Sequence, residues 1–352
     1  MTEEKRRVIV DQTHCGRHVT GIERITLELF SAEALAPFDA RILRSPDRKR
    51  MIFDQMISLP VASWRDPRAL VLCSGFPPTP GLALRGDRVV TYIHDLFLLT
   101  RPQDLNWRAK FYMAPSLRFA LKRLRRFLVN SETTGAELLK FARRDAEIRL
   151  YRPEVRNVLG LPFVDRSQRD NKSGPRFVAL GTVEPRKNLA AAARIVAALR
   201  AKGFPDATLD IVGRDGWGDE SARLKQLEGV TLHGYLPIER IREIMSAADL
   251  FISTSHAEGL GLPLLEAQYS GIPVIAPDQP VFREALAESG SFIFPEDTEK
   301  SADMIASVMR REGWRVASAT ASLANIARWN ETARADHAAV IAWLEELSAS
   351  LK

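Results

Sequence analysis

The sequence predicts an α/β protein of two domains, each built on a doubly wound parallel sheet. Short β-branched apolar runs alternate with helical segments along most of the chain, which is typical of parallel sheets covered by helices. A polar stretch at residues 163–176 interrupts this alternation and suits a linker. The chain has 352 residues, enough for about two ordinary domains.

The elements of the first half follow a strand–loop–helix order. The run RVIVDQT at 7–13 is β-branched, and the segment IERITLELFSAEAL after it has helical spacing. Buried strands are expected at 69–75, 88–96 and 127–131, and helices at 108–127 and 133–144.

The second half repeats the same organisation after the linker. Strands are expected at 177–182, 208–213, 230–236, 250–255 and 273–277, with helices between most of them. The tail WNETARADHAAVIAWLEELSASL has the pattern of one long amphipathic helix. Ligands of open parallel sheets lie at the carboxyl ends of strands, so a cleft between the two domains is the expected site.

Composition narrows the classes of protein that remain. Up to Lys172 the chain has 31 Lys and Arg against 20 Asp and Glu, and from Ser173 it has 19 against 24. This asymmetry indicates that the first half faces an anionic surface or ligand. Nucleic acid is not favoured, because no zinc-finger spacing, RNA-binding aromatic motif or basic heptad helix occurs. With only two cysteines and no apolar run long enough to span a membrane, a reducing cytoplasm is expected.

Two acids stand in one Gly-rich segment, EGLGLPLLE at 258–266. Gly259 and Gly261 allow backbone N–H groups to approach a ligand closely, and a helix start there favours phosphate. Glu258 and Glu266 suit neutral hydroxyl groups instead, as strong acceptors. A ligand that has phosphate groups next to several hydroxyl groups fits a sugar nucleotide. The alternative is that Glu266 only complements the helix dipole and Glu258 is solvated.

A second loop, GTVEPRKN at 181–188, follows another buried strand. Arg186 and Lys187 stand just before a helix. The planar guanidinium of Arg186 and the compact ammonium group of Lys187 suit a diphosphate at such a helix start. Taken alone, such a pair is usually solvated. In the same domain as the acidic Gly-rich loop it favours nucleotide binding.

These two motifs carry a family resemblance over nearly the whole chain. EGLGLPLLE resembles the acidic E-x7-E signature of retaining glycosyltransferases of the GT-B fold, glycosyltransferase family 4 (group 1), and GTVEPRKN is similar to the diphosphate loop of that family. The resemblance implies an acceptor-binding Rossmann-like domain at 1–170 and a nucleotide-sugar-binding domain at 171–324. It also implies that a helix at 325–352 packs back on the first domain.

The resemblance further implies roles for individual residues. Arg186 and Lys187 would neutralise the diphosphate leaving group, Glu258 would contact the transferred sugar, and Glu266 would hold the ribose hydroxyls. His94, at a strand end in YIHDL, would touch the donor sugar, with Asp95 orienting it. The remaining donor-binding candidates are Gly259, Leu260, Gly261, Tyr235, Leu236, Gly21 and Arg214. The first loop has Gly16 and Gly21 where the family has a double glycine, so its phosphate contacts do not carry over residue by residue.

The implied reaction is a same-face displacement that retains the configuration of a hexose. No D-x-D triplet occurs, so no metal or other cofactor is expected. GDP-mannose is the favoured donor and a UDP-hexose the second, with a glycan or lipid-linked acceptor of cell-surface polysaccharide synthesis. A UDP-sugar epimerase or a non-catalytic sugar-nucleotide binder is the alternative from another class.

The segment 108–126 offers an explanation for the basic excess. It contains seven Lys and Arg and no acid, with Phe and Leu between them. A basic amphipathic helix of this kind can lie on an anionic membrane surface. The alternative is an ordinary helix with one solvated basic face.

Overall fold

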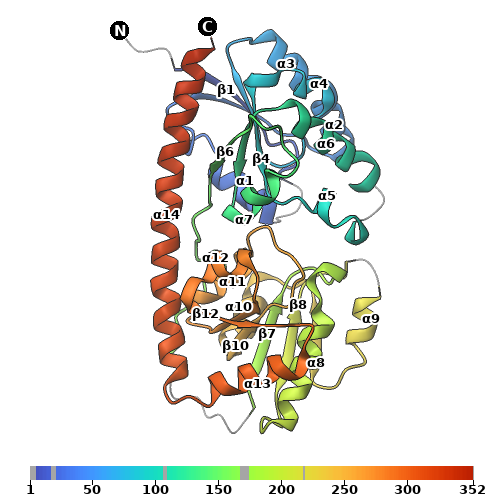
Figure 1. Ribbon diagram of the computed structural model, residues 1–352, viewed down its shortest axis with the longest axis vertical. Helices are drawn as coiled ribbons and strands as arrows, with labels where there is room; N and C mark the ends of the chain where they lie inside the picture. The colour runs from blue at the N-terminus through green and yellow to red at the C-terminus, as the bar shows by residue number, and fades with distance from the viewer. Residues whose placement is uncertain (1–4, 17–20, 106–108, 167–173, 217–218, 352) are drawn as a thin grey trace. The chain divides into compact units, whose positions relative to one another are not determined.

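The structure, a computed structural model, describes residues 5–16, 21–105, 109–166, 174–216 and 219–351. The chain forms two compact units (Figure 1). Unit 1 consists of Met1–Glu154 and Glu331–Lys352, and unit 2 of Val155–Asn330. No helix in these described ranges is both long and apolar enough to cross a membrane.

Unit 1 contains a parallel sheet in the order β2-β1-β3-β4-β5-β6. Its strands are β1 (Arg7–Asp11), β2 (Asp39–Leu43), β3 (Leu70–Cys73), β4 (Val89–Ile93), β5 (Arg126–Val129) and β6 (Glu147–Leu150). The central strands β3 and β4 are buried at every residue, as expected where helices cover both faces of a parallel sheet. The edge strands β2 and β6 are largely half-exposed.

Helices of several lengths connect the strands of unit 1. They are α1 (Gly21–Leu29), α2 (Arg48–Phe53), α3 (Leu59–Arg65), α4 (Pro80–Ala83), α5 (Phe97–Thr100), α6 (Ala114–Arg123) and α7 (Glu132–Leu138). π-Helical segments at Asp54–Ser58 and Ala109–Met113 lead into α3 and α6. Ser131 caps α7 by accepting a hydrogen bond from the Thr134 amide at 3.0 Å.

Unit 2 has a second parallel sheet, in the order β12-β11-β10-β7-β8-β9. Its strands are β7 (Arg176–Leu180), β8 (Thr208–Val212), β9 (Val230–Gly234), β10 (Leu250–Ile252), β11 (Val274–Pro277) and β12 (Gly290–Ile293). The helices are α8 (Leu189–Ala201), α9 (Glu220–Leu224), α10 (Ile238–Ala247), α11 (Leu262–Gln268), α12 (Pro280–Leu286), α13 (Thr298–Met309) and α14 (Trp314–Ser350). Two six-stranded parallel sheets confirm the predicted α/β fold class.

The segment that joins the two sheets belongs structurally to unit 2 from Val155 onward. Val155 and Leu161 are buried in the core cluster that includes Phe251. The Arg166 side chain donates hydrogen bonds to the carbonyls of Ala248 (2.8 Å) and Val164 (3.1 Å) and to that of Ser270. The unit therefore begins before the predicted linker at 163–176, of which 167–173 lie outside the described residues.

The last helix contributes to both units. Its first part includes Trp329, which is 1% exposed in the core cluster of unit 2. Its second part, from Glu331, is tied to unit 1 by Asp336, which accepts from Arg152 at 2.8 Å, and by His337, whose Nδ1 lies 3.1 Å from the Tyr151 hydroxyl. Part-buried polar contacts thus hold residues 331–350 on unit 1.

Candidate functional site

The strand order of unit 2 reverses direction between β7 and β10, which are neighbours in the sheet although β8 and β9 separate them in sequence. In open parallel sheets this switch point, at the carboxyl ends of the strands, is where ligands bind. The loop after β7 carries Arg186 and Lys187, and the loop after β10 carries Glu258. Both predicted motifs therefore reach the same place in the fold.

Local geometry fixes the loop after β7. Pro185 opens a 3₁₀ turn over Pro185–Lys187, and Asn188 ends it with φ of 50°, a left-handed conformation that Asn adopts more readily than most residues. The loop after β10 is hydrogen-bonded to this turn. The Thr254 hydroxyl donates to the Asn188 carbonyl at 2.8 Å, and the His256 amide donates to the Arg186 carbonyl at 2.8 Å.

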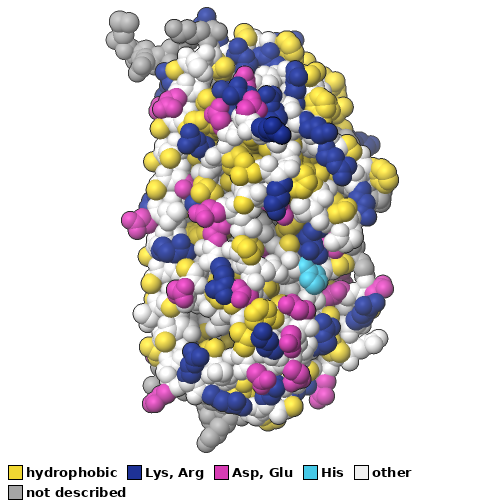
Figure 2. Space-filling view, viewed as in Figure 1, with side chains coloured by type: hydrophobic (Ala, Val, Ile, Leu, Met, Phe, Trp, Pro, Cys, Tyr) yellow, Lys and Arg dark blue, Asp and Glu magenta, His cyan; other side chains and the backbone are white. Residues whose placement is uncertain are grey.

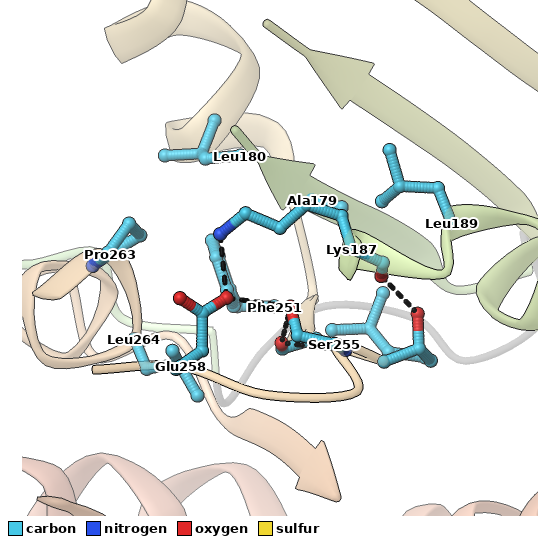
Figure 3. Close-up of a pocket in the computed structure, with 12 residues that line it drawn as sticks. Ala179, Leu180, Lys187, Leu189, Phe251, Ser255, Glu258, Pro263 and Leu264 are labelled. Atoms are coloured by element: carbon cyan, nitrogen blue, oxygen red, sulfur yellow. Dashed lines mark hydrogen bonds and ion pairs between the residues drawn. The ribbon is translucent and has the colours of Figure 1, made fainter. Parts of the chain in front are cut away.

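Charged side chains from the two loops form one compact cluster (Figure 3). Lys187 Nζ lies 2.6 Å from Glu258 Oε1, and Arg186 Nη1 lies 3.0 Å from Glu258 Oε2. Arg186 Nη2 donates to Glu184 Oε1 at 2.6 Å, and the Ser255 hydroxyl donates to Glu258 Oε1 at 2.7 Å. Each charged side chain of the cluster is between 10% and 17% exposed.

The cluster shifts the pKa of Glu258 and of Arg186 toward the charged form. Burial alone would raise the pKa of Glu258, but the charges of Lys187 and Arg186 outweigh burial and hold the pKa at about 2. Burial would lower the pKa of Arg186, and the neighbouring carboxylates of Glu258 and Glu184 raise it above its usual value. Two cations thus face two carboxylates, and an incoming anion has to compete with Glu258 for the same donors.

A pocket opens beside this cluster and contains both Lys187 and Glu258 (Figure 3). Its other lining residues are Ala179, Leu180, Leu189, Phe251, Ile252, Ser253, Thr254, Ser255, Pro263 and Leu264. Apolar walls with a few polar groups at one end are the usual make-up of a small-molecule site. Sequence reasoning singled out neither Glu184 nor Ser255, although the quoted EPRKN motif contains the first of them.

The Gly-rich segment contributes Glu258, Pro263 and Leu264 to the pocket. Gly261 has φ of +82°, and a Cβ there would lie 2.9 Å from the Leu264 side chain, so glycine is needed. Leu260 is 4% exposed and packs in the core cluster. Glu266 is 5% exposed and is the fifth residue of α11.

The candidates near the other strands of unit 2 lie together as a pair. Arg214 follows β8 and Tyr235 follows β9, the neighbouring strand. The Arg214 guanidinium carbon lies 5.3 Å from the centre of the Tyr235 ring. Tyr235 is 75% exposed. Leu236 is half-buried beside it. A stacked cation and ring offer a flat surface for a planar group.

His94 and Gly21 belong to unit 1. His94 follows β4, is 8% exposed, and its Nε2 lies 2.9 Å from the Ser74 carbonyl. A carbonyl only accepts, so Nε2 carries the proton. Asp95 accepts from the Phe97 amide at 3.0 Å at the start of α5. Gly21 begins α1, and residues 17–20 of the first loop lie outside the described residues.

We expect His94 to make stability depend on pH. Burial lowers the pKa of His94 from 6.5 to about 4. The hydrogen bond to Ser74 raises this pKa, and the charge of His14 lowers it further, but both effects are smaller than that of burial. The unfolded chain therefore binds more protons between these pH values, and stability falls as pH drops below 6.5. From pH 7 to pH 5 the loss attributable to His94 is about 2 kcal/mol.

Urea unfolding at both pH values, on wild type and on His94→Gln, measures this contribution. The variant is expected to show the smaller loss between pH 7 and pH 5. Equal losses in the two proteins would show that His94 does not titrate below its ordinary range.

Comparison with known proteins connects this geometry to a family. Residues 163–328 match the family model of group 1 glycosyl transferases. An O-antigen chain mannosyltransferase B of Escherichia coli is 27% identical over 66% of this chain and 64% of its own length, which is less than two thirds of that relative. The solved structure of WaaG, a glycosyltransferase involved in lipopolysaccharide biosynthesis, superposes with a TM-score of 0.67 at 16% identity, over 95% of this chain and 98% of WaaG. The solved structure of Anabaena HepE in complex with UDP-glucose superposes with a TM-score of 0.67 at 16% identity, over 95% of this chain and 100% of HepE.

The two parallel sheets have the GT-B fold of the solved glycosyltransferase structures compared above. Residues 163–328, slightly less than half of the chain, match the group 1 glycosyl transferases, and both predicted motifs lie within these residues. This confirms the resemblance drawn from the two motifs.

Proposed function

We propose that this protein transfers a hexose, with retention of configuration, from a nucleoside-diphosphate sugar to a glycan or lipid-linked acceptor. The observation that carries the proposal is the pair Arg186 and Lys187, largely buried at the carboxyl end of β7 beside a pocket. Two adjacent buried cations match the charge of a diphosphate. The group 1 family match and the mannosyltransferase relative support the same reaction class.

The arrangement of charges suggests how these residues act. The donor diphosphate takes over hydrogen bonds that Arg186 and Lys187 now give to Glu258. The released Glu258 carboxylate accepts hydrogen bonds from the sugar hydroxyls. As the bond to the sugar breaks, negative charge grows on the leaving phosphate, where both cations stabilise it. The acceptor hydroxyl attacks the anomeric carbon from the same face, and its proton passes to the departing phosphate oxygen. This stabilisation requires no metal ion.

The remaining roles follow from position. The Arg214–Tyr235 surface, with Leu236 beside it, takes the base, and Glu266 holds the ribose. Gly259, Leu260 and Gly261 supply backbone N–H groups to sugar and phosphate. For His94 and Gly21, which belong to unit 1, a part in donor binding rests on the family resemblance alone.

GDP-mannose is the donor that we favour, because the relative compared above is a mannosyltransferase of O-antigen chains. A UDP-hexose is the second candidate, since HepE was solved with UDP-glucose. We place the reaction in cell-surface polysaccharide synthesis in the cytoplasm, at the inner face of the membrane. The exposed cations Lys110, Arg118, Lys122 and Arg123 of the segment 108–126 support this placement; its Arg108 lies outside the described residues.

A donor screen by calorimetry tests the proposal. GDP, UDP, ADP and their common sugars are titrated in the presence of EDTA into wild type and into Arg186→Ala/Lys187→Ala. We expect selective binding of one nucleoside diphosphate, and its loss in the double variant. The matched control is Arg223→Ala, which removes a cation of unit 2 whose side chain is 76% exposed, and which should bind as wild type does.

The outcomes separate the alternatives. Binding of a nucleotide sugar without transfer to any acceptor would indicate a non-catalytic binder, and interconversion of the sugar would indicate an epimerase. No binding of any nucleotide, or binding only when EDTA is replaced by a divalent cation, would contradict the proposed metal-free donor site.

A further inference from the structure

Residues 48–65 of unit 1 form one continuous helical run, which buries Leu59 and Ala62 but turns most of its large apolar side chains outward. The run consists of α2, the π-helical segment Asp54–Ser58 and α3. Six large apolar residues on it are exposed, namely Ile52 (46%), Phe53 (49%), Met56 (48%), Ile57 (49%), Val61 (40%) and Trp64 (61%). We call these six residues the outward apolar face. Exposed apolar residues gathered in this way mark an interaction surface.

Polar contacts on the opposite side of the run hold this orientation. Asp54 is 6% exposed and accepts hydrogen bonds from the hydroxyls of Ser45 (2.8 Å) and Ser58 (2.7 Å). Gln55 is equally buried and donates to the Thr13 hydroxyl at 3.0 Å. Rotating the run to bury its apolar side chains would break these buried hydrogen bonds, which is costly. The run therefore presents its apolar residues to the outside in the folded protein.

Cations surround the outward apolar face. Arg48, Lys49 and Arg50 are exposed at the start of the run, and Arg65 and Arg68 at its end. A guanidinium group lies over each of two aromatic rings of the face. The guanidinium carbon of Arg50 is 5.1 Å from the centre of the Phe53 ring, and that of Arg85 is 4.5 Å from the centre of the Trp64 ring. Of the acids on this stretch, Asp54 is buried, and Asp66 forms an ion pair with Arg7 at 2.8 Å.

The same side of unit 1 continues the pattern. Helix α4 contacts both α3 and α6, and it is followed by Leu84, which is 55% exposed. Figure 2 shows hydrophobic and basic side chains lying side by side over the helices that Figure 1 labels α3 and α4. The surface therefore joins apolar groups to positive charge.

We propose that the outward apolar face of residues 48–65 inserts into the surface of an anionic lipid bilayer. Aromatic and aliphatic side chains enter the boundary between headgroups and acyl chains, and the flanking cations meet the lipid phosphates. Arg50 already pairs with Asp54 at 3.1 Å. Charge complementarity selects this occupant, because a neutral apolar partner would supply no counter-charge for the exposed cations Arg48, Lys49, Arg65 and Arg68. The segment 108–126, proposed above from its sequence, buries Leu117, Leu121 and Leu124 in the core. That segment leaves two large apolar residues exposed, Phe111 (79%) and Phe119 (39%), whereas residues 48–65 expose six. Residues 48–65 are therefore the larger insertion element.

Co-sedimentation with vesicles tests this surface on the full chain. The vesicles contain phosphatidylethanolamine with phosphatidylglycerol, and vesicles of phosphatidylcholine alone serve for comparison. The test variant is Phe53→Ser/Ile57→Ser/Trp64→Ser. The matched control, Leu139→Ser/Val316→Ser/Leu323→Ser, removes three apolar residues elsewhere that are 64%, 53% and 46% exposed. All six positions are exposed, so both variants should fold.

We expect wild type and the control to bind the anionic vesicles, less at high salt, and to bind phosphatidylcholine weakly. The test variant should partition roughly 100-fold less while its nucleotide binding stays unchanged, which keeps this inference separate from the proposed donor site. Absence of wild-type binding, or equal binding by the test variant, would overturn it. So would a wild-type dimer in vesicle-free solution that the test variant abolishes, because a second copy would then cover the face.

Discussion

Replacing Arg186 with alanine is expected to lower the rate of sugar transfer by about 10²–10³-fold, as loss of one oxyanion donor does elsewhere. The Arg186 guanidinium is held by Glu184, Glu258 and the Ala257 carbonyl, so it is positioned before the donor arrives. Removing it takes away half of the positive charge that would meet the leaving phosphate. Turnover of the donor identified by calorimetry, measured with saturating acceptor, gives the effect on kcat and on kcat/KM.

Glu258→Gln is the matched comparison, because it changes the same ion cluster with the opposite effect on charge. Neutralising Glu258 releases Lys187 and Arg186 from their present partner. We expect the free nucleoside diphosphate to bind more tightly to this variant while transfer slows, since the carboxylate no longer holds the sugar. If Arg186→Ala leaves both donor affinity and turnover unchanged, the cation pair is not the diphosphate site.

Arg152→Ala is expected to destabilise unit 1 by about 3–5 kcal/mol, the usual cost of breaking a buried ion pair. The Arg152 side chain is 5% exposed, and Asp336 on α14 is 15% exposed. Without the guanidinium, the Asp336 carboxylate stays largely buried with its main counter-charge gone. Glu132, the second partner, is 72% exposed and regains water instead. Hydrogen exchange of residues 331–350 against denaturant measures the change where the pair anchors the helix.

Two further variants show whether the buried charge causes this loss. Arg152→Ala/Asp336→Ala should recover part of it, because no carboxylate is left without a partner. Arg143→Ala removes an arginine that pairs with Asp145 at the surface, with side chains 37% and 47% exposed, and should cost about 1 kcal/mol or less. Equal losses from Arg152→Ala and Arg143→Ala would contradict the explanation by burial.

The central strands of both sheets could be predicted from the sequence, whereas three strands at sheet edges could not. Strands β3 and β4 are buried at every residue and consist of β-branched and apolar residues, the composition that marks a buried parallel strand. The unpredicted strands are β2, β6 and β12, each at the edge of its sheet. Their sequences DARIL, EIRL and GSFI are short and mostly half-exposed, so no apolar run marks them.

The motifs of the candidate site could be found in the sequence, but not the contacts between them. Glu258 and Lys187 are 71 residues apart, and their 2.6 Å contact exists because β10 lies directly beside β7. That adjacency depends on the order of the whole sheet. Residues 48–65 show a related limit: a helical apolar pattern predicts a buried face, and only the buried contacts of Asp54 and Gln55 reveal that the face points outward.

The discontinuous make-up of unit 1 also constrains how the protein is made. Residues 331–352 belong to that unit, but all of unit 2 is encoded between them and residue 154. At roughly 5–20 residues per second, a ribosome needs on the order of ten seconds or more to translate this insertion. During that interval the nascent first sheet lacks the partner of Arg152 and the ring partner of Tyr151, His337. Unit 2 can complete its core first, and unit 1 closes only once the final helix has left the ribosome.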